Sequence, residues 1–136
     1  MASAAIASIS PCFIVGDVGR TIAFYRELGF DLMVQEPAED PFFAIVIRDG
    51  AMLFVKDVDT PALPNARRHP WAQWDAYVNT PDPDALAAEL AARGVAFSTP
   101  LADTEDGLRG FELTDPDGYV LFFGRPRSTP PSASEA

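Results

Sequence analysis

The hydrophobic pattern of the chain changes period several times, and it does so twice in the same order. Uncharged, largely apolar residues at 6–15 predict a strand, and helical spacing follows from Asp17 to Leu28. Asp17 is a good N-cap, and Gly29 stands where a helix ends in a left-handed residue. Three strand-like segments come next, at 30–35, 42–47 and 52–56, the last two joined by an Asp-Gly turn. This order predicts a β-α-β-β-β unit.

The second half of the chain repeats this order after a proline-containing connector at 57–70. A strand is expected at 71–79, and a helix begins at Asp82-Pro83 and ends at Gly94. Asp82 stands in the same relation to Gly94 as Asp17 does to Gly29. The remaining strand-like segments are 95–99, 108–114 and 119–124, with an Asp-Pro-Asp-Gly turn before the last.

This repetition predicts an α+β fold of two tandem βαβββ modules whose strands form a curled mixed sheet. The modules are expected at about 6–56 and 71–125, in a single domain of residues 1–127. Residues 128–136, rich in Pro, Ser and Ala, are expected to be disordered.

Charge narrows the classes of partner. The formal net charge of −10 argues against nucleic acid and anionic membranes, because both need a basic footprint. It would favour a cationic ligand, although solubility alone also accounts for it. No hydrophobic run approaches the ~20 residues of a membrane span. The only cysteine, Cys12, excludes an intrachain disulfide, which fits a cytoplasmic location.

Two motifs carry a resemblance to a known family. The first is Phe-Ile-Val-Gly-Asp-Val at 13–18 with Ala-Phe-Tyr-Arg-Glu-Leu-Gly-Phe at 23–30, and the second is Asp-Pro-Asp-Gly-Tyr at 115–119. Together, in a duplicated chain, they resemble the vicinal oxygen chelate superfamily of glyoxalases, extradiol dioxygenases and bleomycin-resistance-type proteins. The resemblance implies paired βαβββ modules around a cleft. In metal-dependent members, four inward-facing positions on the first and last strands of each module supply the ligands.

The residues at those four positions do not suit a metal. They are Ser10, Phe54, Trp74 (or Asp75, if the register shifts by one) and Phe122. Phenylalanine offers no lone pair to a metal ion, and the single histidine, His69, lies in the connector. The chain is therefore similar to the bleomycin-resistance-type members, which lack the ligands and sequester a flat cationic drug between two subunits. This similarity implies a homodimer with no metal and no cofactor.

Two-residue alternation along the strands predicts the lining of the cleft. The inward-facing residues would be Ser10, Cys12, Ile14, Met52, Phe54, Trp74, Ala76, Val78, Val120 and Phe122. The residues expected to contact a ligand are Ser10, Cys12, Phe54, Trp71, Trp74, Arg109 and Phe122. Such a lining suits an aromatic or amphipathic small molecule. Four acids, Asp103, Glu105, Asp106 and Glu112, would either attract a positive group or simply form a solvated loop.

Catalytic interpretations have less support in the sequence. Cys12 as a nucleophile would need a base, and a cysteine in an apolar strand is more often inert packing. His69 could pair with Asp59 or Asp75 as an acid and base, but no spacing requires it. The leading hypothesis is a metal-free small-molecule binding protein without catalytic residues. The alternatives are a lyase, isomerase or dioxygenase whose metal is held by Asp75, Glu112 or His69, and a scaffold protein without a ligand.

Overall fold

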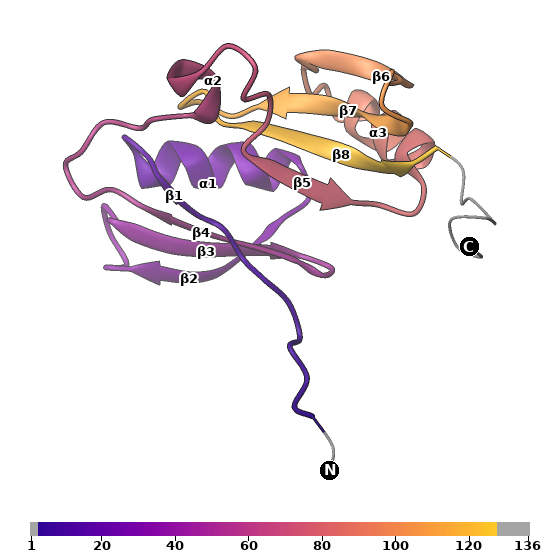
Figure 1. Cartoon of the computed structure of the whole chain (residues 1–136). Coiled ribbons are helices and arrows are strands. Elements are labelled where there is room, and N and C mark those ends of the chain that lie inside the picture. The colour runs from indigo at the N-terminus through magenta and orange to yellow at the C-terminus, as the bar shows by residue number, and fades with distance from the viewer. Residues whose placement is uncertain (1–2, 128–136) are drawn as a thin grey trace. The chain divides into compact units, whose positions relative to one another are not determined.

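The computed structural model describes residues 3–127, and the chain divides between Ala62 and Leu63 into two units (Figure 1). Each unit has a four-stranded mixed sheet and repeats the order β-α-β-β-β. The predicted α+β fold of two tandem modules is confirmed. The tail predicted to be disordered, 128–136, lies outside the described residues. No helix among residues 3–127 is long and apolar enough to span a membrane.

The first unit contains one helix and four strands. They are β1 (Cys12–Ile14), α1 (Val18–Glu27), β2 (Asp31–Glu36), β3 (Phe43–Arg48) and β4 (Ala51–Lys56). The sheet order is β1-β4-β3-β2, with β1 parallel to β4 and the other neighbours antiparallel. The Asp17 carboxylate accepts the Arg20 N–H at 3.0 Å, and Gly29 ends the helix at φ 87°. The predicted capping is therefore confirmed.

The second unit repeats this arrangement with one extra helical turn. Its elements are α2 (Asn65–Arg68), β5 (Ala76–Asn79), α3 (Pro83–Ala92), β6 (Thr99–Asp103), β7 (Leu108–Thr114) and β8 (Val120–Pro126). The sheet order is β5-β8-β7-β6, and β5 runs parallel to β8. Helix α3 contacts β6, β7 and β8, and buries Ala87 and Leu90. One face of this sheet is therefore covered by a helix, and Phe111 and Phe123 stack on it at 5.3 Å.

Three predicted strands are wrong in extent. The first is only Cys12–Ile14, the residues in register with β4, and Ile6 and Ile9 upstream are 90% and 92% exposed. The strand predicted at 71–79 begins only at Ala76. The segment 95–99 is mostly irregular, and β6 begins only at Thr99, although Phe97 packs on Phe111 at 4.9 Å.

Candidate functional site

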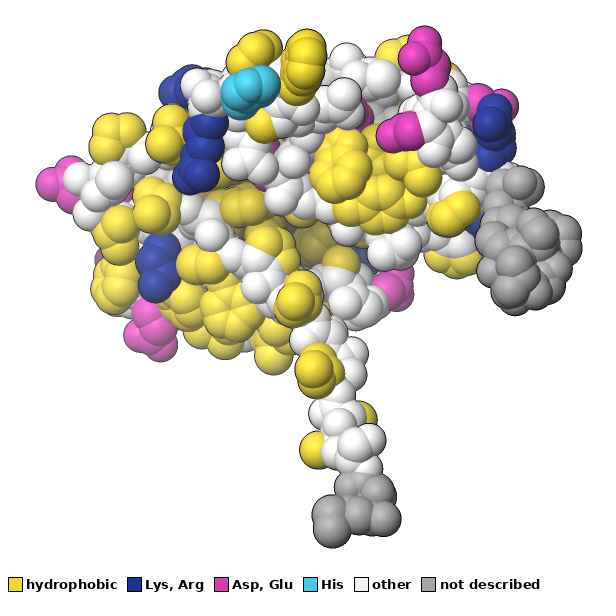
Figure 2. Space-filling model, in the orientation of Figure 1, with side chains coloured by type: hydrophobic (Ala, Val, Ile, Leu, Met, Phe, Trp, Pro, Cys, Tyr) yellow, Lys and Arg dark blue, Asp and Glu magenta, His cyan; other side chains and the backbone are white. Residues whose placement is uncertain are grey.

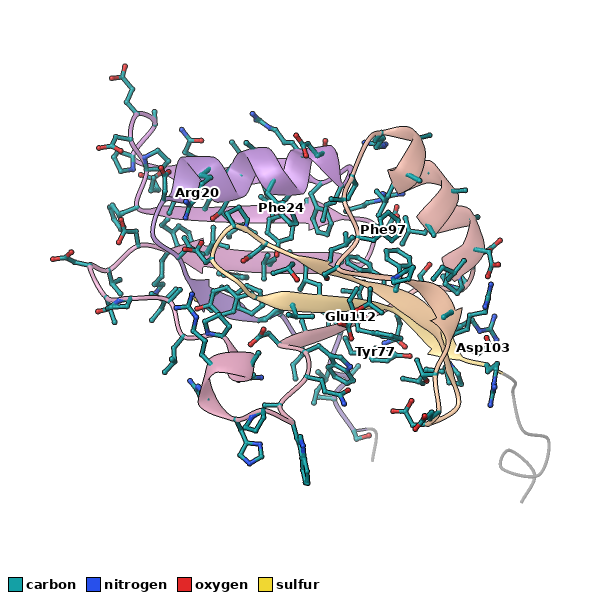
Figure 3. All side chains as sticks on the ribbon, turned by 90° about the horizontal axis from the view of Figure 1, so that it is seen from above. Arg20, Phe24, Tyr77, Phe97, Asp103 and Glu112 are labelled. Carbon is teal, nitrogen blue, oxygen red and sulfur yellow. The ribbon has the colours of Figure 1, made fainter. Side chains whose placement is uncertain are left out.

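A row of four side chains crosses the sheet of the second unit on the face away from α3. Tyr77 is the register partner of Phe122, Phe122 of Glu112, and Glu112 of Thr99. Register partners point to the same side of a sheet, so the row runs from β5 to β6. The Thr99 hydroxyl donates to the Glu112 carboxylate at 3.1 Å, which orients the acid beside the Phe122 ring. Tyr77 and Glu112 are labelled in Figure 3.

Three aromatic rings meet at the β5–β8 side of this row. The Trp74 ring lies 6.0 Å from Phe122 at an interplanar angle of 30°, in a stacked arrangement. Tyr77 contacts both, at 5.4 Å from Trp74 and 5.3 Å from Phe122. Phe122 is only 3% exposed, whereas Trp74 and Tyr77 are half-buried. The buried ring therefore supports two rings that keep contact with solvent.

Two glycines make room for the Phe122 ring. Gly110 and Gly124 are register partners in adjacent strands. A Cβ atom at Gly110 would lie 2.6 Å from the Phe122 ring, and one at Gly124 would lie 2.5 Å from it. Either distance is a clash, so the ring fits over the glycine pair because neither residue has a side chain.

The turn between β6 and β7 presents two acids in a fixed conformation. The Thr104 N–H donates to the Leu108 carbonyl at 2.8 Å, and the Leu108 N–H donates to the Thr104 hydroxyl oxygen at 2.9 Å. The same hydroxyl donates to the Asp106 carboxylate. Glu105 and Asp106 are both exposed at this turn.

These features line a cavity of about 350 Å³ that is open to solvent on one side. Its lining consists of Gln73, Trp74, Thr104, Glu105, Asp106, Leu108, Glu112 and Phe122. Among these lining residues, three are acids and none is Lys or Arg. Figure 2 shows acidic side chains beside hydrophobic ones over this part of the second unit. Burial, and secondarily the negative charge of Asp106, raise the pKa of Tyr77, in accord with a cavity edge that is both partly dry and acidic.

The cavity brings together some of the predicted residues and adds others. Trp74 and Phe122 meet there, as do the acids Glu105, Asp106 and Glu112. The prediction that Ala76 and Val78 face the same side as Phe122 is wrong. They pair with Leu121 and Phe123 on the face toward α3, because the chain is irregular at 74–75 and alternation does not continue from Trp74 into β5. Residues missed in the sequence are Gln73, Tyr77, Thr104 and Leu108.

Arg109 and Trp71 lie elsewhere in the second unit. The Arg109 guanidinium donates to both oxygens of Asp84 at 2.8 Å and to Asp103 at 3.1 Å. It lies on the α3 face, and these hydrogen bonds raise its pKa further and lower that of Asp84. Trp71 is 83% exposed and does not line the cavity. The structure therefore does not bring either residue together with Phe122.

The candidates in the first unit form a separate group. Cys12 is the register partner of Phe54, so both lie on the face away from α1. Phe54 also contacts the Phe43 ring at 6.0 Å and is half-buried, whereas Cys12 is exposed. Ser10 is half-buried and precedes β1. Ile45, Met52 and Phe54 make the middle of this face apolar, and the charged residues Asp31, Glu36 and Lys56 lie on the same face.

The residues proposed for catalysis or metal binding have other roles. Both Asp75 oxygens accept backbone N–H groups at 2.8 Å, one from Asn65 and one from Val120, so this carboxylate fastens α2 to β8. His69 accepts the Trp71 N–H at its Nδ1 atom, 3.1 Å away, and no hydrogen bond within residues 3–127 joins it to Asp59 or Asp75. In the same range, no group of three or more His, Cys, Asp and Glu side chains is placed to hold a metal ion. The donor set does not fit a metal centre.

Both units repeat the βαβββ order, and in the second unit the sheet face opposite α3 carries the cavity. A profile of the Glyoxalase/Bleomycin resistance protein/Dioxygenase superfamily matches residues 5–123, and the chain belongs to that superfamily. The resemblance stated from the sequence motifs is thereby confirmed.

Solved structures with the same fold include TioX, a bleomycin-binding protein and a bleomycin resistance determinant. TioX from Micromonospora sp. ML1 is 22% identical, with a TM-score of 0.67 over 87% of this chain and 97% of that one. The bleomycin-binding protein of bleomycin-producing Streptomyces verticillus, complexed with copper(II)-bleomycin, is 25% identical, with a TM-score of 0.64 over 89% and 97%. The bleomycin resistance determinant of transposon Tn5 is 21% identical, with a TM-score of 0.65 over 89% and 98%. A search of curated protein sequences found no match.

Proposed function

We propose that the protein binds a small organic molecule with a flat ring and a positive charge, and sequesters it without converting it. The observation that carries this proposal is the cavity in which Trp74 and Phe122 stack beside Glu105, Asp106 and Glu112. Aromatic faces bind flat rings through buried area and stacking. The same faces and the nearby carboxylates attract cations, so one ligand satisfies both features.

The size of the cavity limits what it holds. Ligand pockets span roughly 300–1,000 Å³, so about 350 Å³ is at the small end and fits one ring system with its charged substituent. A larger molecule would extend beyond it. Bleomycin, present in the Streptomyces verticillus structure, is larger than this cavity, so it tests whether a molecule that extends beyond the cavity still binds.

Binding without chemistry is supported by the side chains at the site. The described lining contains no His, Cys or Lys, and its one hydroxyl, on Thr104, is held in the turn by the Asp106 carboxylate and the Leu108 N–H. Phe54 and Phe122 stand where metal-dependent relatives would place ligands, which supports a protein that works without a metal. We propose a cytoplasmic location on the evidence of the single cysteine.

We also propose that the protein is a homodimer. The support is the sheet face of the first unit opposite α1, where Ile45, Met52 and Phe54 are apolar and only half-buried. Apolar surface of this kind is buried in stable homodimers. Sedimentation equilibrium gives the mass directly, and a monomer at all concentrations would contradict this part of the proposal.

The test of ligand binding uses ethidium, a rigid cationic aromatic dye, and bleomycin with and without copper(II). The variant Trp71→Phe leaves Trp74 as the only tryptophan, so quenching of its fluorescence reports on the cavity. Saturable quenching by at least one of these cations is expected. No binding of either, by fluorescence and by calorimetry, would overturn the proposal.

A matched pair of variants tests the role of charge. Glu112→Gln removes a cavity charge but keeps an acceptor for the Thr99 hydroxyl, and should weaken binding about five- to tenfold. Glu89→Gln makes the same change on α3, where the acid pairs with Arg93 at 3.0 Å, and should leave binding unchanged. Equal effects would show that the carboxylates of the cavity are not recognition groups. A stoichiometric transition metal in protein purified without added metal would favour the enzymatic alternative.

A further inference from the structure

The second unit carries an exposed basic and aromatic projection beside α2, which we call the basic knob. It consists of Arg67, Arg68, His69 and Trp71. All four are exposed, Trp71 at 83%. The His69 and Trp71 rings contact each other edge-on at 6.0 Å. Basic and hydrophobic side chains gather over this part of the chain in Figure 2.

The two arginines of the basic knob lack an acidic partner among the described residues. The sequence has 20 Asp and Glu against 10 Lys and Arg, so acidic partners are plentiful. Arg93, Arg109 and Arg127 each form an ion pair. Within residues 3–127, Arg67 and Arg68 form none, and neither do Arg26, Lys56 and Arg125, but only Arg67 and Arg68 are neighbours in the sequence. Arg and Trp are also the residues that most often dominate the energetics of protein interfaces.

The basic knob is held in a defined position. The Asn65 N–H donates to Asp75 at 2.8 Å, and the His69 N–H donates to the Asn65 carbonyl at 3.2 Å. The Trp71 N–H donates to His69 Nδ1, and the Ala72 N–H donates to the His69 carbonyl at 3.1 Å. Ordering these side chains on contact with a partner therefore costs little backbone entropy.

The basic knob is complementary to the cavity of the same unit in charge and in aromatic character. It offers guanidinium cations and an indole ring, and the cavity offers carboxylates beside Trp74 and Phe122. Trp71 does not reach its own cavity, because the hydrogen bonds at 69–72 hold it outside the lining. We propose that the basic knob of one copy occupies the acidic cavity of a second copy, so that self-association blocks the binding site.

This inference rests on the proposed function, since it gives the cavity a competing occupant. A reciprocal arrangement would make two equal contacts and close a dimer, while a one-way contact would build chains. In both cases salt weakens the association because its attraction is between exposed charges. A cationic ligand would compete with the basic knob, so it should dissociate the assembly.

A charge exchange tests the contact. One variant reverses the knob, Arg67→Glu with Arg68→Glu, and another reverses the cavity turn, Glu105→Lys with Asp106→Lys. Sedimentation velocity over a concentration series, at low and high salt, measures the salt-sensitive association. Each reversal alone should weaken it about tenfold, and both in one chain should restore it to within about threefold of wild type. Trp71→Ala, which leaves the charge unchanged, should also weaken it.

The inference is overturned if either reversal leaves the association unchanged, or if the combined variant does not recover it. Ethidium binding by the knob reversal, measured in dilute protein, separates this result from the proposed function. If the dye binds but the charge exchange does not restore association, only the inference fails. If the exchange restores association but neither the dye nor bleomycin binds, the proposed function fails and the self-contact stands.

Discussion

Glu112 and Phe122 are direct cross-strand partners on β7 and β8, so a half-buried carboxylate stands beside a fully buried ring. The Thr99 hydroxyl holds the acid from the next strand, and Trp74 stacks on the ring from the other side. A flat cation seated against Trp74 would therefore meet a negative charge at the edge of the same aromatic cluster. This geometry links the position of the rings to the choice of ligand charge.

The ring of Phe122 should matter more for binding than its apolar bulk. Phe122→Leu keeps an apolar side chain but removes the stacked partner of Trp74, and we expect ethidium binding about three- to tenfold weaker. Titration of the dye against Trp74 fluorescence measures the change. A variant that binds as tightly as wild type would show that stacking on Phe122 does not support the site.

Replacing Gly110 with alanine should disrupt the floor of the site. Its Cβ would lie 2.3 Å from the Phe123 carbonyl oxygen and 2.6 Å from the Phe122 ring, so both strand and ring must move. We expect a loss of at least about 2 kcal/mol in the free energy of unfolding. Gly50→Ala is the control, since no atom lies within 4 Å of its added Cβ. Urea denaturation compares the two, and similar stabilities would contradict the packing described.

Asp75 should be a structural residue whose charge is needed for two backbone contacts. Asp75→Asn keeps one acceptor oxygen and turns an NH₂ group toward either the Asn65 or the Val120 N–H. We expect about 2–3 kcal/mol of destabilisation, because a half-buried backbone donor loses its partner. Asp49→Asn, at an exposed turn, should change stability by less than about 0.5 kcal/mol. An equally small effect at Asp75 would refute this role.

The buried turn acid Asp115 should make stability depend on pH. Burial raises its pKa from 3.8 to about 6, against the N–H bonds from Tyr119 and Asp117. The folded state then holds this proton more tightly than the unfolded state. The contribution of Asp115 to the free energy of unfolding therefore falls as pH rises from about 4 to 7. Asp115→Asn cannot titrate. The free energy of unfolding of the Asp115→Asn variant, relative to that of the wild type, should therefore rise by about 2 kcal/mol between pH 4 and pH 7.

Denaturation of both proteins at several pH values checks this expectation. The constant cost of the substitution appears at pH 4, where the Asp115 carboxyl is protonated in the folded state. Parallel stability curves from pH 4 to pH 7 would mean that Asp115 titrates alike in both states. The pKa assigned to the buried carboxyl would then be wrong.

The duplicated fold was predictable because its signals are local. Asp17 and Asp82 both accept from the first turn of their helices, and Gly29 and Gly94 both end them at positive φ. These signals depend on neighbouring residues alone, so they survive without knowledge of the tertiary structure. The hairpin at β7 and β8 follows from its turn for the same reason.

Strand extent and register were less predictable because they depend on partners far along the chain. Ala76 and Val78 were assigned to the wrong face, since nothing local shows that regular alternation begins only after Asp75. Tyr77 was missed by the same error. The register of β5 against β8, in which Tyr77 pairs with Phe122, is what places Tyr77 beside the site.

The acidic half of the site shows a different limit of sequence reasoning. Glu105 and Asp106 have the composition of an ordinary solvated loop, and only the Thr104 contacts show that they flank a cavity. The glycines beneath Phe122 gave no sequence signal beyond their presence in strands, where a close approach is a common cause.

The Thr104 turn also bears on which molecules the cavity should prefer. Its hydrogen bonds order the loop before a ligand binds, so the loop loses little conformational entropy on binding. The loss of conformational entropy on binding is then mainly that of the ligand. Stiff, fused-ring compounds should outcompete floppy analogues of equal charge, and ranking a ligand series by rotatable bonds should order their affinities.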